Sequence, residues 1–77
     1  MPRVKLGEPS GTEEIYEELF GQYGGMITRK QVGEYIGVKD PRAVVAFLAG
    51  VPEHHITGRL IRYRARDVAR EIARTRA

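Results

Sequence analysis

Apolar residues that recur three and four positions apart predict four short helices in this chain of 77 residues. In the first helix Ile15, Leu19 and Tyr23 fall on one face, together with the neighbouring rings of Tyr16 and Phe20. Because a chain of this length buries only about 60% of the surface that its unfolded form exposes, we expect these faces to form one compact core. The helices are expected at residues 12–22, 28–36, 41–49 and 66–75.

Residues that favour helix ends stand at these boundaries. Ser10 and Glu13 have the spacing of a capping box, and Thr12 offers a second register for the same cap. Thr28 and Gln31 form a second capping box before the next helix. The third helix has Asp40 as its cap and Pro41 in its first position, and glycines end the first three helices: Gly24, Gly37 and Gly50.

Residues 53–64 show alternation instead of helical spacing. Ile61 and Tyr63 fall on one face of an extended segment, and the residues beside them fall on the other. A glycine turn ahead of this segment predicts a two-stranded hairpin. The predicted fold class is therefore mainly α with a small β-hairpin. We expect a flexible N-terminal arm at residues 1–11 and a single domain at residues 12–77.

Basic residues are concentrated near the end of the chain. The net charge of +3 arises from 13 basic and 10 acidic side chains, and ten of the basic ones are arginine. Residues 1–25 carry −3, with two basic and five acidic side chains, whereas residues 59–77 carry +5, with seven arginines and two acidic side chains. Guanidinium groups match phosphates and guanine edges as a fork, so a polyanionic partner is one explanation of this asymmetry. An arginine-rich helix exposed to solvent is the other.

Two short helices around Gly37, followed by a basic hairpin, form the pattern of a winged helix-turn-helix. In that arrangement the second helix fits the major groove of duplex DNA, and the hairpin reaches the adjacent backbone or minor groove. Four segments give this pattern more detail: ITRKQVGEYIGV (27–38), DPRAV (40–44), GRLIRY (58–63) and RDV (66–68). In this order and spacing, over about residues 26–75, the chain resembles the excisionase-type, MerR-like DNA-binding domains.

The resemblance implies a sequence-selective duplex-DNA-binding protein of a phage or an integrative mobile element, associated with the nucleoid in a bacterial cytoplasm. Such proteins act either as excisionases, which direct a recombinase towards excision, or as small transcription regulators. The implied partners are double-stranded DNA, a tyrosine recombinase (integrase), and further copies of the protein bound cooperatively. Residues 1–25 lie outside the resemblance, so the helix at 12–22 either covers the core or offers its acidic surface to a partner. A module for protein–protein interaction on the same fold is the alternative function.

The helix at 41–49 departs from the resemblance, because its exposed face has few hydrogen-bond donors. Only Arg42, with Lys39 in the preceding turn, can pair strongly with a base. Alanine and valine can contact a thymine methyl, so we expect limited base reading and an affinity that depends on phosphates and DNA shape. In the alternative interpretation, Val45 and Ala46 form a protein interface. The candidate contacts in this region are Thr28, Arg29 and Lys30, at a helix N-terminus that favours anions, and Lys39, Arg42, Ala43, Val45 and Ala46.

The hairpin carries the other candidate contacts with DNA. Arg59 is expected at its tip, where a guanidinium could enter a narrow minor groove. Arg62 and Arg64 share one strand face and could follow the phosphates, or that face is simply exposed to solvent. Arg66, at the start of the last helix, could reach the same DNA backbone.

Other chemistry has little support in the sequence. The chain has no cysteine, and His54 and His55 are neighbours on a strand that point to opposite faces, so we expect no metal site and no cofactor. Neither a paired nucleophile and base nor a glycine-rich phosphate loop is visible, which argues against an enzyme or a small-molecule substrate. No apolar run approaches the roughly 18 residues that span a bilayer, so we expect no association with a membrane.

Overall fold

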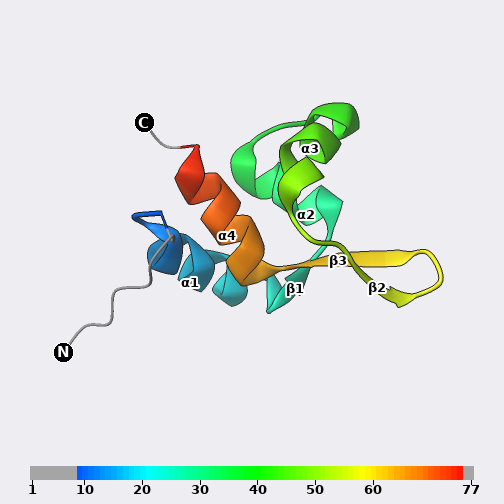
Figure 1. The fold of residues 1–77 in the computed structure, drawn as a ribbon, viewed down its shortest axis with the longest axis horizontal. Helices are drawn as coiled ribbons and strands as arrows, with labels where there is room; N and C mark the ends of the chain where they lie inside the picture. Colours follow the sequence, from blue (N-terminus) through cyan, green and yellow to red (C-terminus); the bar gives the residue numbers. More distant parts are fainter. Residues whose placement is uncertain (1–8, 76–77) are drawn as a thin grey trace.

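The structure of the protein is a computed structural model that describes residues 9–75 (Figure 1). The expected arm at residues 1–11 therefore lies mostly outside the described residues. In chain order the elements are α1 (Thr12–Tyr23), β1 (Met26–Ile27), α2 (Arg29–Ile36), α3 (Pro41–Phe47), the 3₁₀ turn η1 (Leu48–Gly50), β2 (His54–Thr57), β3 (Leu60–Arg64) and α4 (Ala65–Arg74). This part of the chain is mainly helical with a small antiparallel sheet, which confirms the predicted fold class at that level.

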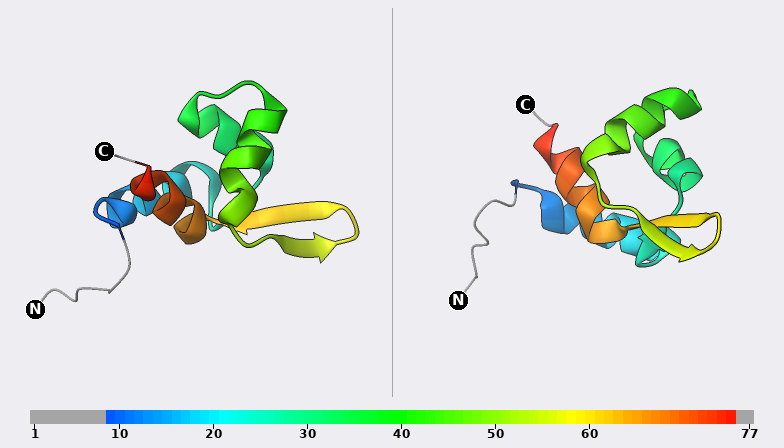
Figure 2. Two further views of the ribbon diagram at one scale, coloured as in Figure 1. Left: turned by 45° about the horizontal axis from the view of Figure 1, so that its top comes forward. Right: turned by 45° about the vertical axis from the view of Figure 1, so that its right-hand side comes forward.

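Two pairs of helices are joined by the sheet. α1 and α4 lie against each other, and α2 and α3 form the second pair. In Figures 1 and 2 the β2–β3 hairpin extends beyond the helices on the side of α2 and α3, away from α1. The two ends of the molecule therefore present different elements to solvent.

One core holds these elements together. Leu19 of α1, Ile27 of β1 and Val32 of α2 are fully buried, and so is Val68 of α4. Tyr63 of β3, which the alternation places on the inner strand face, is only 1% exposed. The helices α1, α2 and α4 thus each contribute a fully buried side chain. Val44 of α3 and Leu48 of η1 are also buried, with exposed fractions of 4% and 2%.

Phe20 does not join this core, although its place in the apolar stripe of α1 predicts that it should. Its exposed fraction is 52%. The ring lies 5.8 Å, between centroids, from that of Tyr16, and its edge covers Gly25, where an added Cβ would lie 3.6 Å from Phe20 Cε2. The buried face of α1 is therefore narrower than the spacing suggests, because only Ile15 and Leu19 of this stripe are buried, while Tyr16 and Tyr23 are half-buried against the core.

The capping box predicted at Ser10 is wrong. The N-cap of α1 is Gly11, with a φ of 92°, and no side chain among residues 9–75 caps this helix. The Glu13 carboxylate instead accepts hydrogen bonds from Arg66 of α4. The Thr12 hydroxyl donates to the carbonyl oxygen of Pro9 at 2.7 Å. Because these groups have other partners, they are not placed to receive the amides that a capping box binds.

The other two predicted caps are confirmed. Thr28 Oγ1 accepts a hydrogen bond from the Gln31 amide, and Gln31 Oε1 accepts one from the Thr28 amide, both at 3.0 Å. Asp40 Oδ1 accepts from the Arg42 amide at 3.0 Å, and Pro41 occupies the first position of α3. Both members of the α2–α3 pair therefore begin where the sequence predicts.

Over the described residues the sheet has three strands, which corrects the prediction of a two-stranded hairpin alone. β1 pairs with β3 in antiparallel register, with Met26 opposite Arg64 and Ile27 opposite Tyr63, so that the strand order is β1-β3-β2. Two residues are too few to show alternation, and the preceding glycines mark only a helix end. β1 thereby joins the end of α1 to the base of the hairpin.

The contact between α2 and α3 is unusually close at Gly33. A Cβ on this residue would lie 2.9 Å from the carbonyl oxygen of Val38 and 3.1 Å from Cγ2 of Val44. Gly37, with a φ of 78°, makes the turn that brings the two helices together. α3 is also shorter than predicted, since it ends at Phe47 and η1 continues the chain.

Candidate nucleic-acid interface

The outer face of α3 is open to solvent. Ala43 and Ala46 are exposed, and Val45 is 44% exposed, whereas Val44 on the opposite face is buried. The Arg42 side chain is 95% exposed, and its Nε lies 3.9 Å from Asp40 Oδ1, a loose contact. The spacing of apolar residues in the sequence predicts this division of α3, and the structure confirms it.

A groove lies where α2, the following turn and α3 meet. It has a volume of about 740 Å³ and a largely apolar surface. Lys30 of α2 and Lys39 of the turn line it, together with Val45. With Arg29, four candidate contacts therefore line one concave surface, which also includes the carboxylate of Glu34. The complete lining is Arg29, Lys30, Gly33, Glu34, Gly37, Val38, Lys39, Pro41, Val44 and Val45.

The β2–β3 hairpin presents its arginines to solvent. Arg59 and Arg64 are exposed, and Arg62 is half-buried, with its Nη1 donating to the carbonyl oxygen of Ile61 at 3.2 Å. None of these three arginines forms an ion pair with another residue between 9 and 75. Gly58 makes the turn before Arg59 with a φ of 49°, which favours glycine. The hairpin is thus a source of uncompensated positive charge.

Arg29 has partners within the protein. Its Nε donates to the Tyr63 hydroxyl oxygen at 3.0 Å, and its Nη2 donates to Glu53 Oε2 at 3.1 Å. The Tyr63 hydroxyl in turn donates to the same Glu53 oxygen at 3.3 Å. The three side chains join the start of α2, the strand β3 and the segment that precedes β2. The sequence singles out Arg29 as a phosphate contact, and the structure places it where it also orients the hairpin.

These contacts change the acidity of two groups. The hydrogen bond with Tyr63 is the main cause that raises the pKa of Arg29, so this guanidinium is always charged. Partial desolvation acts to raise the pKa of Glu53, but hydrogen bonds from His55 and Arg29 and the charge of Arg29 together outweigh it and lower that pKa. Both groups of the pair are therefore ionised at neutral pH.

The arginines of α4 differ from those of the hairpin. Arg66 makes a fork with both carboxylate oxygens of Glu13, at 3.1 and 3.2 Å, and its guanidinium lies 4.4 Å from the centre of the Tyr16 ring. Ion pairs also join Arg70 to Asp67, at 3.0 Å, and Arg74 to Glu71, at 3.6 Å. Arg66, a candidate DNA contact, is thus brought to α1 and not to the hairpin. The arginines between residues 59 and 75 therefore divide into those of α4, which form ion pairs with carboxylates, and those of the hairpin, which form none with the described residues.

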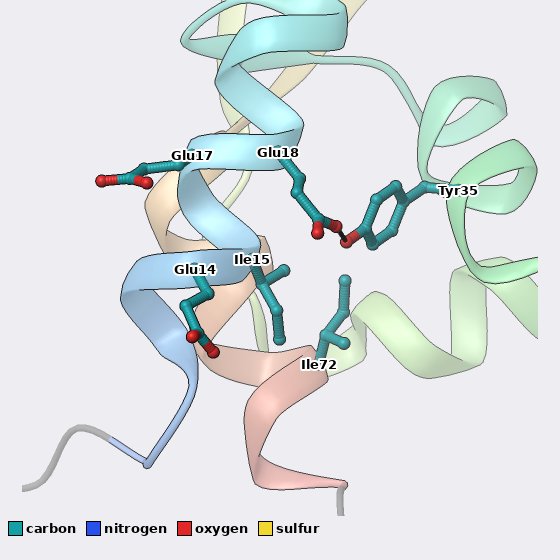
Figure 3. Close-up of a pocket in the computed structure, with 6 residues that line it drawn as sticks. All are labelled: Glu14, Ile15, Glu17, Glu18, Tyr35 and Ile72. Atoms are coloured by element: carbon teal, nitrogen blue, oxygen red, sulfur yellow. Dashed lines mark hydrogen bonds between the residues drawn. The ribbon is translucent and has the colours of Figure 1, made fainter.

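The side of α1 that faces away from the β2–β3 hairpin carries acidic side chains. Glu14, Glu17 and Glu18 of α1 line a second groove, of about 780 Å³, together with Ile15, Tyr35 and Ile72. Figure 3 shows Glu18 directed towards the Tyr35 hydroxyl, which donates a hydrogen bond to it, while Glu17 points away. Negative charge therefore gathers on the side of the fold away from the hairpin.

Three residues that shape this candidate site escape prediction from the sequence: Glu53, Tyr63 as a hydrogen-bonding group, and Gly33. The alternation identifies Tyr63 as a core residue. Its hydroxyl accepts a hydrogen bond from Arg29, which is 34 residues away in the sequence, so the alternation does not predict this contact. Glu53, next to Pro52, has no distinguishing spacing. For Gly33 the available signal is a glycine inside a helical pattern, a position that often marks a close approach.

No protein-family model, no curated protein and no solved structure matches the chain. Within residues 9–75, no helix has the length and apolar character needed to cross a membrane. The same residues contain no cluster of three or more side chains able to hold a metal ion. The function has to be inferred from the geometry of the chain itself.

Proposed function

We propose that this protein is a winged helix-turn-helix protein that binds duplex DNA, with α3 in the major groove and the β2–β3 hairpin as the wing. One observation carries the proposal: α3, with its exposed outer face, and the β2–β3 hairpin lie on the side of the fold away from α1 (Figures 1 and 2), and the three arginines of β3 and its turn have no carboxylate partner among residues 9–75. The acidic groove beside α1 lies at the other end. A phosphate backbone is attracted to the first end and repelled by the second, which gives the protein one favourable orientation on DNA.

Each group has a distinct role in this arrangement. Arg59, at the hairpin tip, enters or borders the minor groove, and Arg62 and Arg64 neutralise phosphates beside it. Lys30 and Lys39 neutralise phosphates at the edges of the groove between α2 and α3. Thr28 caps α2 and directs its amide dipoles towards the same strand, and Arg29 acts mainly by orienting the wing.

Base reading is limited in this proposal. Arg42, nearly fully exposed, can form a bidentate pair with guanine. Ala43, Val45 and Ala46 offer only apolar contact to thymine methyl groups. DNA shape and deformability then supply much of the sequence preference.

The resemblance of the chain to excisionase-type, MerR-like domains suggests the biological role. We propose a non-enzymatic factor that needs no cofactor, either an excisionase-like protein that works with a tyrosine recombinase or a small transcription regulator. A bacterial cytoplasm is the compartment that this role implies. The order of caps, turn, hairpin and closing helix between residues 26 and 75 is what supports this proposal.

Salt-dependent binding tests the DNA proposal. A fluorescein-labelled duplex of about 24 base pairs is titrated by anisotropy at several salt concentrations. Six cations face the proposed DNA side, and if each neutralises one phosphate, the logarithm of the binding constant falls with the logarithm of salt at a slope of about −5. The six residues are Lys30, Lys39, Arg42, Arg59, Arg62 and Arg64.

Matched variants identify the surface used. Replacing Arg59, Arg62 and Arg64 together with glutamine makes the slope shallower by about 3 in the proposed orientation. The double change Arg70→Gln and Arg74→Gln alters charge on α4, where the arginines are paired, and leaves the slope nearly unchanged. Equal effects of the two sets would place the DNA elsewhere.

A second candidate function is a module for protein–protein interaction. The observation that favours it is the apolar groove beside Val45, which a polar nucleic acid does not require. In that case binding to the duplex is absent even in dilute buffer. The salt titration therefore decides between the two candidates.

A further inference from the structure

Two large apolar side chains are exposed at the end of the β2–β3 hairpin. Ile56 is 53% exposed and Leu60 is 46% exposed. The strand register shifts between His55 and Thr57, and Thr57 is opposite Leu60, so Ile56 is the extra residue of a bulge next to that pair. The two apolar side chains therefore belong to the same few residues of the hairpin tip.

Leu60 lies on the basic face of the hairpin. Side chains along a strand alternate between the two faces, so Leu60 shares a face with Arg62 and Arg64, while Ile61 and Tyr63 face the core. Arg59 directly precedes it. From His54 to Arg66 the chain contains no acidic residue. An apolar tip set in this basic surface is complementary to a negatively charged partner, and duplex DNA is the polyanion that the proposed function supplies.

We infer that Leu60, with Ile56 beside it, is an apolar wedge that enters the minor groove of duplex DNA and partly unstacks one base step. The inference rests on the proposed DNA-binding function and adds the mode of contact at the wing. Apolar side chains inserted between base steps occur in minor-groove proteins, where flanking arginines and lysines hold the phosphates. Arg59, Arg62 and Arg64 provide such flanking charge here. Base steps that unstack easily are then the preferred binding sites, although no hydrogen-bond donor of the wing contacts the base edges there.

A mismatch tests the wedge without knowledge of the natural binding site. Two labelled duplexes of about 24 base pairs are compared, one fully paired and one with a single central T·T mismatch, where stacking is already weakened. The protein is expected to bind the mismatched duplex about tenfold more tightly, because part of the unstacking is no longer required. In a second pair of duplexes, 2-aminopurine replaces an adenine next to the central position. Its fluorescence rises when the base unstacks, so it reports unstacking directly when the protein binds.

Variants assign the preference to the hairpin tip. In Leu60→Ala the preference for the mismatched duplex is expected to disappear, so that the two duplexes bind about equally. Leu60→Met is expected to restore the preference. Phe20→Ala removes an equally exposed apolar side chain from α1 and keeps the tenfold preference. Thermal unfolding checks that each variant is folded, and we expect little change in the transition, because a half-exposed side chain contributes little to the core.

Three results would overturn the inference. Equal binding of both duplexes by the unchanged protein, or a tenfold preference that persists in Leu60→Ala, removes the wedge while the DNA-binding proposal stands. The apolar tip would then be assigned to a protein partner. Absence of salt-dependent binding to either duplex removes the proposed function, and the wedge with it.

Discussion

Arg29 Nε, at the start of α2, donates a 3.0 Å hydrogen bond to the hydroxyl oxygen of Tyr63 on β3. Because Tyr63 is 1% exposed, its hydroxyl is held in place by the core. The bond therefore links the α2–α3 pair to the hairpin and restrains the angle between them. In the proposed complex this angle decides whether α3 and the wing can contact one duplex together.

Removing the Tyr63 hydroxyl tests this link. Tyr63→Phe keeps the buried ring, and we expect it to lower the free energy of unfolding by about 1–2 kcal/mol, because Arg29 and Glu53 each lose a hydrogen bond. We also expect weaker duplex binding in conditions where the variant is fully folded. Urea unfolding and anisotropy measure the two effects. Tyr16→Phe, which removes a hydroxyl from the ring that contacts Arg66 of α4, serves as the control. Unchanged affinity in Tyr63→Phe would contradict the orienting role.

The same three-residue contact predicts a dependence of stability on pH. The pKa of Glu53 lies below its ordinary value of 4.5, so its charged form favours the folded state. The stabilisation is complete above pH 4.5 and is lost as the pH falls through the lower pKa of the folded protein. Urea unfolding of the unchanged protein and of Glu53→Gln should therefore differ near neutral pH and converge in acid. A difference that stays constant down to about pH 2 would show that Glu53 acts through shape and not through charge.

Substitution by alanine is expected to have opposite effects on stability at two helical glycines, Gly33 and Gly21. At Gly33 an added Cβ would meet backbone of the turn at 2.9 Å, so Gly33→Ala should destabilise the protein by about 1–3 kcal/mol. At Gly21 nothing lies within 4 Å of the added atom, and Gly21→Ala should stabilise α1 by about 0.5–1 kcal/mol. Chemical denaturation measures both. Equal changes at the two positions would mean that the approach of α2 and α3 is not limited by Gly33.

The parts of the fold that the sequence predicts are those with local causes. Thr28 and Gln31 are three residues apart, and Asp40 precedes Pro41, so their caps follow from neighbouring residues alone. β1 has no such local pattern, because two residues acquire strand geometry only by pairing with β3. The exposure of Phe20 likewise depends on how much of α1 the neighbouring elements cover, and the spacing of residues along the helix gives no information about that.

The candidate site divides in the same way. Exposure of the outer face of α3 follows from the spacing of its buried residues, and Arg59 follows from a glycine turn. The partners of Arg29 and Arg66 do not, since Glu53 lies 24 residues from the first and Glu13 lies 53 residues from the second. A count of charges in the sequence therefore overstates the number of arginines that remain unpaired.

The Arg66–Glu13 fork should stabilise the fold and contribute little to DNA binding. Glu13 is largely exposed and Arg66 is 23% exposed, so a double-mutant cycle with Glu13→Gln and Arg66→Gln is expected to give a coupling energy of about 0.5–1 kcal/mol. Arg66→Gln should weaken duplex binding less than Arg62→Gln does, because Arg62 has no carboxylate partner within the described part of the chain. Equal losses would return Arg66 to the DNA-contacting surface.

Selectivity and affinity should separate between α3 and the wing. Arg42 is 95% exposed and has only a 3.9 Å contact with Asp40, so it is available to a base edge, where a bidentate pair with guanine is worth about 1–3 kcal/mol of discrimination. We expect Arg42→Ala to relax sequence preference in a selection from randomised duplexes. Arg59→Ala should instead weaken binding to all duplexes to a similar degree, because contacts to phosphate and to groove shape are made at most sequences. If Arg42→Ala lowered affinity uniformly and left the selected sequences unchanged, α3 would lie against the backbone and the wing would have to carry the sequence preference.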